Sequence, residues 1–137
     1  MAEVQKYTVR AVAKGVDVAP RKVGIVASLV RGRSVADALV ILEHTNRRSA
    51  RPVAKVIASA QANATNNHSL DAKSLVISTL SVTTGPRMKR FKPHMRGMAL
   101  PFQKKSSHIL VEVTGTEKVK KKPAAKKVDA AKEEKES

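Results

Sequence analysis

Residues 84–107 constrain the fold of this 137-residue chain more than any other segment. The segment contains three prolines and two glycines, and it separates two runs rich in β-branched or alternating apolar residues, at 75–83 and 109–113. The two runs favour strands that pair antiparallel, but the connection between them is too long for an ordinary hairpin turn. If it runs out and back as two strands of about 12 residues, it projects roughly 40 Å from the sheet.

The charge of this segment makes it unstable as an isolated hairpin. It carries no Asp or Glu, and its seven cations are Arg87, Lys89, Arg90, Lys92, Arg96, Lys104 and Lys105. An isolated two-stranded ribbon is marginal in water, and seven like charges destabilise it further. We therefore expect the segment either to be disordered or to be held by a polyanion.

The whole chain supports a nucleic-acid partner. Its 27 Lys and Arg face 11 Asp and Glu, which gives a net charge of +16, and such an excess favours polyanion binding. Further cations flank two helical segments, namely Arg21, Lys22, Arg31, Arg33, Arg47, Arg48 and Arg51. His94 and His108 lie in or beside the cationic segment, where we expect phosphate or base contact. With one Tyr and two Phe there is no platform for stacking bases, so recognition of backbone and shape fits better.

Other functional classes lack the residues they need. The chain has no cysteine, so disulfides, thiolate metal sites and a catalytic thiol are excluded. Its four histidines show no metal-ligand spacing, and no paired acid and base, phosphate-binding glycine loop or nucleophile elbow is present. We expect no enzyme activity, metal or cofactor. The start is charged, and the apolar stretch at 23–30 is too short to span a membrane, which indicates a soluble, unexported protein.

Periodicity predicts the first elements. Residues 7–13 alternate as in a half-buried strand, and Pro20 and Gly32 are typical of the start and end of a helix over 20–31. Ser34 and Asp37 resemble a capping box that opens a second, short helix.

The longest helix is predicted over 46–64, with a buried face of mostly small residues. Pro52 leaves its start open between Asn46 and a cap at Ser49, because a proline is tolerated only in the first turn. The sequence predicts an α+β fold, with three helices packed on a small three-stranded antiparallel sheet and a long protruding basic β-hairpin. This domain covers 1–115, and 116–137 forms a low-complexity tail rich in Lys, Ala and Glu that we expect to be disordered.

Several motifs, taken together, are specific. They are Ala19-Pro20-Arg21-Lys22-Val23, Leu29-Val30-Arg31-Gly32, Ala38-Leu39-Val40-Ile41-Leu42, Thr45-Asn46-Arg47-Arg48, Ala60-Gln61-Ala62-Asn63-Ala64, Gly85-Pro86, Met88-Lys89-Arg90 and Lys104-Lys105-Ser106-Ser107-His108-Ile109. In order and spacing, over about residues 7–113, the chain resembles the bacterial family of large-subunit ribosomal protein twenty-two.

The resemblance implies a structural protein of the large ribosomal subunit in the cytoplasm. Members of that family have an α+β body near the exit of the nascent-peptide tunnel and a hairpin that threads inward through ribosomal RNA. Its implied partners are large-subunit ribosomal RNA, neighbouring proteins including protein four at the tunnel, and the nascent polypeptide, with no homo-oligomer. By the resemblance, Ser107 also contacts RNA, and the tip at the tunnel comprises Met88, Lys89, Arg90, Phe91 and Lys92.

Two other readings compete with this one. A general architectural protein that compacts nucleic acid would have the same charge, and it would bind duplex DNA and ribosomal RNA with comparable affinity. A small RNA-processing enzyme would need an acid, base or metal cluster, which the sequence does not offer.

Overall fold

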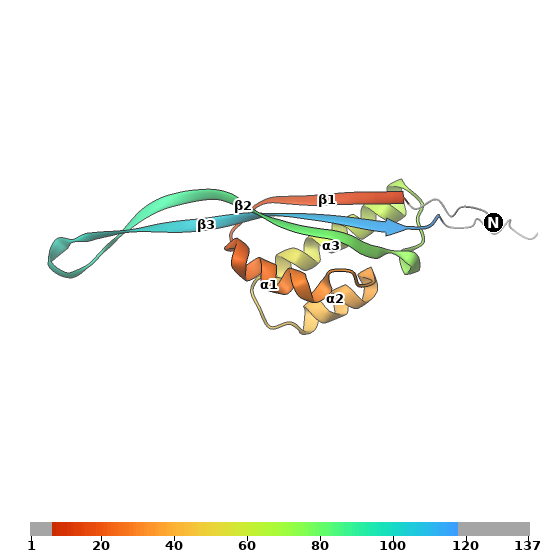
Figure 1. Cartoon of the computed structure of the whole chain (residues 1–137), viewed down its shortest axis with the longest axis horizontal. Coiled ribbons are helices and arrows are strands. Elements are labelled where there is room, and N and C mark those ends of the chain that lie inside the picture. The colour runs from red at the N-terminus through yellow and green to blue at the C-terminus, as the bar shows by residue number, and fades with distance from the viewer. Residues whose placement is uncertain (1–6, 118–137) are drawn as a thin grey trace, which may run out of the picture.

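The computed structural model describes residues 7–117, and it confirms the predicted α+β class (Figure 1). The elements in chain order are β1 (Tyr7–Val16), α1 (Pro20–Val30), α2 (Val35–His44), α3 (Ala50–Asn67), the 3₁₀ turn η1 (Ala72–Ser74), β2 (Val76–Pro93), the 3₁₀ turn η2 (Met95–Gly97) and β3 (Ala99–Gly115). The predicted tail lies outside the described residues from position 118 onward, and the described chain continues two residues past the expected boundary at 115.

Local sequence signals set the start and end of the first helix and the start of the second. Pro20 is the first residue of α1, and Gly32 follows the helix with φ +76°, a conformation that glycine adopts without steric cost. At α2 the Asp37 N–H donates to Ser34 Oγ (3.2 Å), and the Ser34 hydroxyl donates to Asp37 Oδ2 (2.7 Å). The predicted cap is confirmed, although the carboxylate bonds the hydroxyl of Ser34 instead of its backbone.

Helix α3 starts at one of the two predicted positions and ends later than predicted. It begins at Ala50 with Ser49 as N-cap, so Pro52 lies in the first turn, where a missing N–H is tolerated. It continues three residues past 64 because the Leu70 N–H returns to the carbonyl of Ala64 (3.0 Å), with the Leu70 side chain fully buried. This apolar anchor beyond the helix end has no periodic signal in the sequence.

The sheet is antiparallel with the order β1-β3-β2, and the three helices cover one of its faces (Figure 1). Alternate strand residues face the helices: Val9 and Ala11 are buried, whereas Arg10 and Val12 are exposed. The core lies between this face and the helices. Its largest fully buried side chains are Ile57, Leu70, Leu75, Ile77, Leu80 and Ile109.

Strands β2 and β3 continue far beyond β1. The last pair of β1 with β3 is Val16 with Ser107, whereas β2 and β3 remain paired as far as Pro93 with Ala99. The predicted antiparallel pairing is therefore confirmed. Every residue of 86–105 is exposed, and this segment extends past the helices (Figure 1). We call 86–105 the arm and the rest of the described chain the body.

The base of the arm is a bulge at Gly85 and Pro86, where the β2–β3 register shifts. A Cβ on Gly85 would lie 2.6 Å from Ser106 Oγ and 3.1 Å from the Ser106 carbonyl carbon, so a larger residue there would force Ser106 to shift. The Ser106 hydroxyl donates to the Pro86 carbonyl (2.7 Å) and fixes the bulge to the returning strand.

The turn of the arm lies at 94–98, which corrects the predicted tip. The His94 N–H donates to the Met98 carbonyl (2.7 Å), and Arg96 and Gly97 have φ of 54° and 74°. The predicted tip residues, Met88 to Lys92, are instead paired along the strand with Leu100 to Lys104. Strand pairing extends the arm beyond them, so only Phe91 and Lys92 come near the turn.

Candidate nucleic-acid interface

Five of the predicted RNA-binding cations meet in one hollow at the base of the arm. The hollow, which we call the junction pocket, has a volume of about 490 Å³ and lies where the β1–α1 loop, the α2–α3 loop and the returning strand of the arm converge. Its cations are Lys22, Arg47, Arg48, Lys104 and Lys105. Residues from three distant parts of the sequence therefore present positive charge to a common point.

One carboxylate lies among these cations. Asp17 Oδ2 is 3.0 Å from Lys104 Nζ and 4.0 Å from Arg48 Nη2, and all three side chains are more than half exposed. Within residues 7–117 these are the only ion pairs. Asp17 thus connects the arm to the α2–α3 loop while leaving most of the local positive charge uncompensated.

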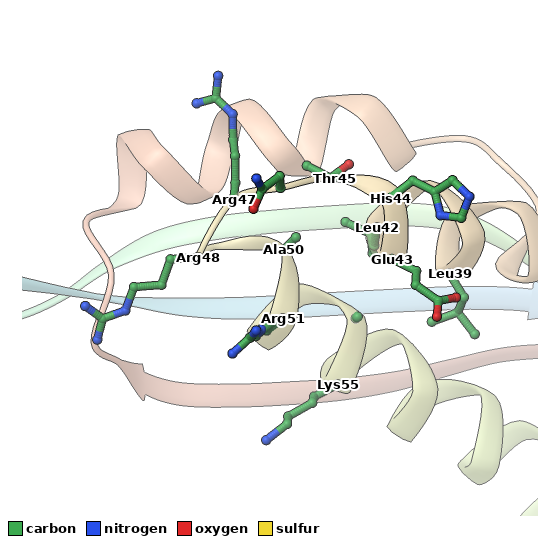
Figure 2. A pocket seen from close by; sticks show the side chains of 12 residues that line it. Leu39, Leu42, Glu43, His44, Thr45, Arg47, Arg48, Ala50, Arg51 and Lys55 are labelled. Atoms are coloured by element: carbon green, nitrogen blue, oxygen red, sulfur yellow. The ribbon is translucent and has the colours of Figure 1, made fainter.

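A second basic hollow, the helix pocket, opens beside the first. It has a volume of about 890 Å³ and lies between the end of α2 and the start of α3. Arg47 and Arg48 line both pockets, and Arg51 and Lys55 extend the positive surface along α3. Figure 2 shows Arg48, Arg51 and Lys55 extending in one direction, whereas Arg47 extends in the opposite direction. The two pockets therefore adjoin through the α2–α3 loop, which contributes Arg47 and Arg48 to both.

The cations of the arm form a third group. Arg87, Lys89, Arg90 and Lys92 lie on the outgoing strand, and Arg96 lies in the turn with His94 before it. All of them are exposed. The Arg90 guanidinium donates from Nη1 to the backbone carbonyl of Lys89 (2.8 Å) and from Nη2 to Met88 Sδ (3.6 Å).

Several predicted contact residues have partners within the protein. Arg31 Nη2 donates to the Leu80 carbonyl (2.7 Å), and Arg33 Nε donates to the Leu29 carbonyl (3.0 Å) at the end of α1. His108 Nδ1 accepts from the Gly15 N–H (2.9 Å). These three side chains hold parts of the body together, although Arg31 and Arg33 remain exposed. Arg21 is exposed on α1.

Ser107 is a correction to the predicted RNA contacts. Its side chain is fully buried beneath the end of β1, and its hydroxyl has no hydrogen-bond partner. The strand alternation that leaves Ser106 half-buried turns Ser107 inward. A direct contact between the Ser107 side chain and RNA is therefore incompatible with this fold.

Sequence reasoning missed Asp17 and Ser49. Ser49 lines the junction pocket with 4% of its surface exposed. Ser49 was considered only as a helix cap, and both residues approach the arm only through folding, because positions 17, 49 and 104 are distant along the chain.

The chemistry of the surface is that of binding. The described part of the chain contains no group of three His, Cys, Asp or Glu side chains that could hold a metal. No helix within 7–117 is long and apolar enough to cross a membrane. Exposed cations on three adjacent regions outnumber the two carboxylates that line the pockets, Asp17 and Glu43, and such an excess suits the closely spaced phosphates of a folded polyanion.

Comparison of the sequence with known proteins identifies its family. The family profile of ribosomal protein L22p/L17e matches residues 11–114. The large ribosomal subunit protein uL22 of Oceanobacillus iheyensis is 50% identical over 105 residues, which cover 77% of this chain and 93% of that protein. The same protein of Pediococcus pentosaceus is 48% identical over 114 residues, covering 83% and 96%, and that of Clostridioides difficile is 48% identical over 104 residues, covering 76% and 94%. The chain belongs to the ribosomal protein L22p/L17e family, a family of structural ribosomal proteins and not of enzymes.

Proposed function

We propose that this protein binds and stabilises the ribosomal RNA of the large subunit, and that its arm reaches the wall of the nascent-peptide exit tunnel. The observation that carries the proposal is the arm itself: residues 86–105 are all exposed, carry seven cations and contain no carboxylate. In this role the protein acts on the ribosome, which in bacteria lies in the cytoplasm.

Electrostatics gives the arm its role in RNA folding. Phosphates of adjacent RNA helices repel one another, and a narrow cationic ribbon inserted between them reduces that repulsion. The ribbon is thin enough to enter a crevice that the body cannot enter. A single arm contacts several RNA segments at once, which favours their association during assembly.

The body contributes a separate contact. The junction pocket and the helix pocket place their cations beside the base of the arm, so RNA that surrounds the arm also meets the body. The body then remains near the surface of the subunit while the arm points inward.

The far end of the arm supplies the tunnel contact. Its turn is at 94–98, with Phe91 and Lys92 just before it. We propose that this end lines the tunnel opposite large-subunit protein four and adjoins the nascent polypeptide. The exposed apolar side chains near the turn, such as Phe91, Met95 and Met98, suit contacts other than phosphate binding.

Reconstitution of large subunits with a chain that lacks residues 87–105 tests both parts of the proposal. We expect the body to bind the subunit still and the density of the tunnel wall to change beside the missing turn, as measured by cryo-electron microscopy. Unchanged tunnel density would contradict the tunnel contact, and loss of all binding would contradict the separate contact made by the body.

A competition experiment separates this function from general nucleic-acid compaction. The full chain is titrated with large-subunit ribosomal RNA against duplex DNA at physiological salt. A ribosomal protein should prefer its RNA by orders of magnitude. Comparable affinities would support the architectural alternative instead.

A further inference from the structure

We propose that the junction pocket binds one backbone phosphate of RNA, and that the carboxylate of Asp17 occupies this position as an internal counter-ion until RNA displaces it. The proposal rests on the RNA-binding function proposed above and goes further by naming the site, the ligand group and the residue that competes with it.

The first argument is the balance of charge. Five cations line the pocket with the one carboxylate of Asp17. Asp17 reaches Lys104 at 3.0 Å and Arg48 only at 4.0 Å, and no ion pair joins it to Lys22, Arg47 or Lys105. The carboxylate therefore neutralises a minority of the positive charge, and the pocket retains a strong attraction for a second anion.

The second argument comes from the two helices that begin at this pocket. Residues just before α1 line it, and so does Ser49, the N-cap of α3. Neither helix has a side-chain cap hydrogen bond or an acidic residue in its first turn, whereas α2, which begins elsewhere, has both. The positive end of the helix dipole at each of these starts favours an anion.

Ser49 adds an independent polar group. The side chain is 96% removed from solvent, yet its hydroxyl makes no cap hydrogen bond to α3. The hydroxyl oxygen is not itself a buried unsatisfied group, since within residues 7–117 only the Ser107 hydroxyl is buried without a hydrogen-bond partner. A phosphate in the pocket supplies acceptor oxygens for that hydroxyl as well as for the cations.

The properties of Asp17 fit a group that gives way. Its ion pairs are exposed to water, and exposed pairs contribute little free energy because solvent screens them. A phosphate diester carries the same charge on oxygens that are spaced to reach several cations at once. Before RNA binds, Asp17 keeps Lys104 of the arm near Arg48 of the body despite their repulsion, so the site is already assembled.

Substitution of Asp17 by asparagine tests the proposal. The full chain and its Asp17→Asn variant are titrated with large-subunit ribosomal RNA over a series of salt concentrations. Because a competing negative charge is removed, we expect the variant to bind about two- to fivefold more tightly at low salt. Its plot of log affinity against log salt should keep the slope of the unmodified chain, since the same number of phosphates is neutralised in both complexes.

Glu112→Gln is the matched control. Glu112 lies in β3 beside Arg10 of β1, away from both pockets, and the substitution changes the net charge by the same amount. We expect its affinity and salt slope to match those of the unmodified chain, which would show that the gain at Asp17 is local. An equal gain in both variants would overturn the proposal, because net charge would then explain it.

The result at Asp17 also separates the two proposals. If the unmodified chain prefers ribosomal RNA to duplex DNA but Asp17→Asn binds no more tightly, or more weakly, the phosphate site is wrong and the proposed function stands. If the unmodified chain shows no preference for ribosomal RNA, the proposed function fails first. Circular dichroism of each variant confirms that the fold is unchanged.

Discussion

The body and the arm share strands β2 and β3, but different forces order the strands in the two regions. In the body, β3 alternates buried and half-buried residues from Ser107 to Gly115, and its apolar side chains pack against the helices. In the arm, the same strand is exposed at every position from Ala99 to Lys105. Backbone pairing is continuous in both regions, so pairing alone does not distinguish them.

This comparison shows which part of the protein folds by itself. Burial of apolar surface drives folding of the body. The arm has only cross-strand pairs and repelling cations, and a two-stranded ribbon of this kind is marginal without support. The arm therefore lacks the apolar packing that stabilises the body, and the body provides the base from which it extends.

The largest expected effect is a change in the free energy of unfolding, and it compares two leucines of the paired strands β2 and β3. Leu80 in β2 is 1% exposed, and Leu100 in β3 is 48% exposed. Leu80→Ala leaves a cavity in the core and should lower the free energy of unfolding by about 2–5 kcal/mol, whereas Leu100→Ala should lower it by less than about 1 kcal/mol. Urea denaturation of the free protein measures both. Similar losses would mean that the arm is packed as the body is.

The next effect concerns the base of the arm. Gly85→Ala places a Cβ against backbone atoms of Ser106 and Ser107, and we expect it to lower the free energy of unfolding by about 1–3 kcal/mol. Gly24→Ala is the control, because nothing lies within 4 Å of its Cβ and alanine favours the interior of α1. It should raise the stability by about 0.5–1 kcal/mol. Hydrogen exchange locates the Gly85 effect, which should appear at the bulge before it appears in the helices.

Deletion of the arm should hardly affect the stability of the body. A chain in which a short turn replaces residues 87–105 loses seven cations but none of the buried core. We expect its free energy of unfolding to change by less than about 1 kcal/mol. If each lost cation contacted a phosphate, the slope of log RNA affinity against log salt should become shallower by about 6. A body that fails to unfold cooperatively after the deletion would contradict its independence.

The sequence was sufficient where a signal is local. Pro20, Ser34 and the alternation of 7–13 predicted their elements because capping and burial act within a few residues. The arm was predictable because its length and its charge exclude a compact alternative. The position of the turn could not be predicted in the same way. Strand register determines how far the pairing extends and which residues, Arg96 and Gly97, adopt left-handed conformations.

The interface was predictable only as a set of cations. Clustering along the chain identified Arg47, Arg48, Lys104 and Lys105, but their convergence in the junction pocket follows from tertiary packing. The burial of Ser107 and the ion pairs of Asp17 also depend on where β1 ends against β3. A single sequence contains no local signal for such contacts.

The smallest effect compares one cation of the arm with one of the body. Lys92→Gln in the arm and Arg10→Gln on β1 each remove one positive charge from an exposed position. The Arg10 side chain lines neither basic pocket, and Arg10 in β1 is paired with Glu112 in β3. Both variants should keep the free energy of unfolding within about 0.5 kcal/mol, because neither charge is buried. Only Lys92→Gln should flatten the salt dependence of RNA affinity, by about 0.9 for one lost phosphate contact. Equal flattening in both variants would show that RNA responds to total charge, and the distinction between an RNA-held arm and a self-supporting body would then lose its electrostatic basis.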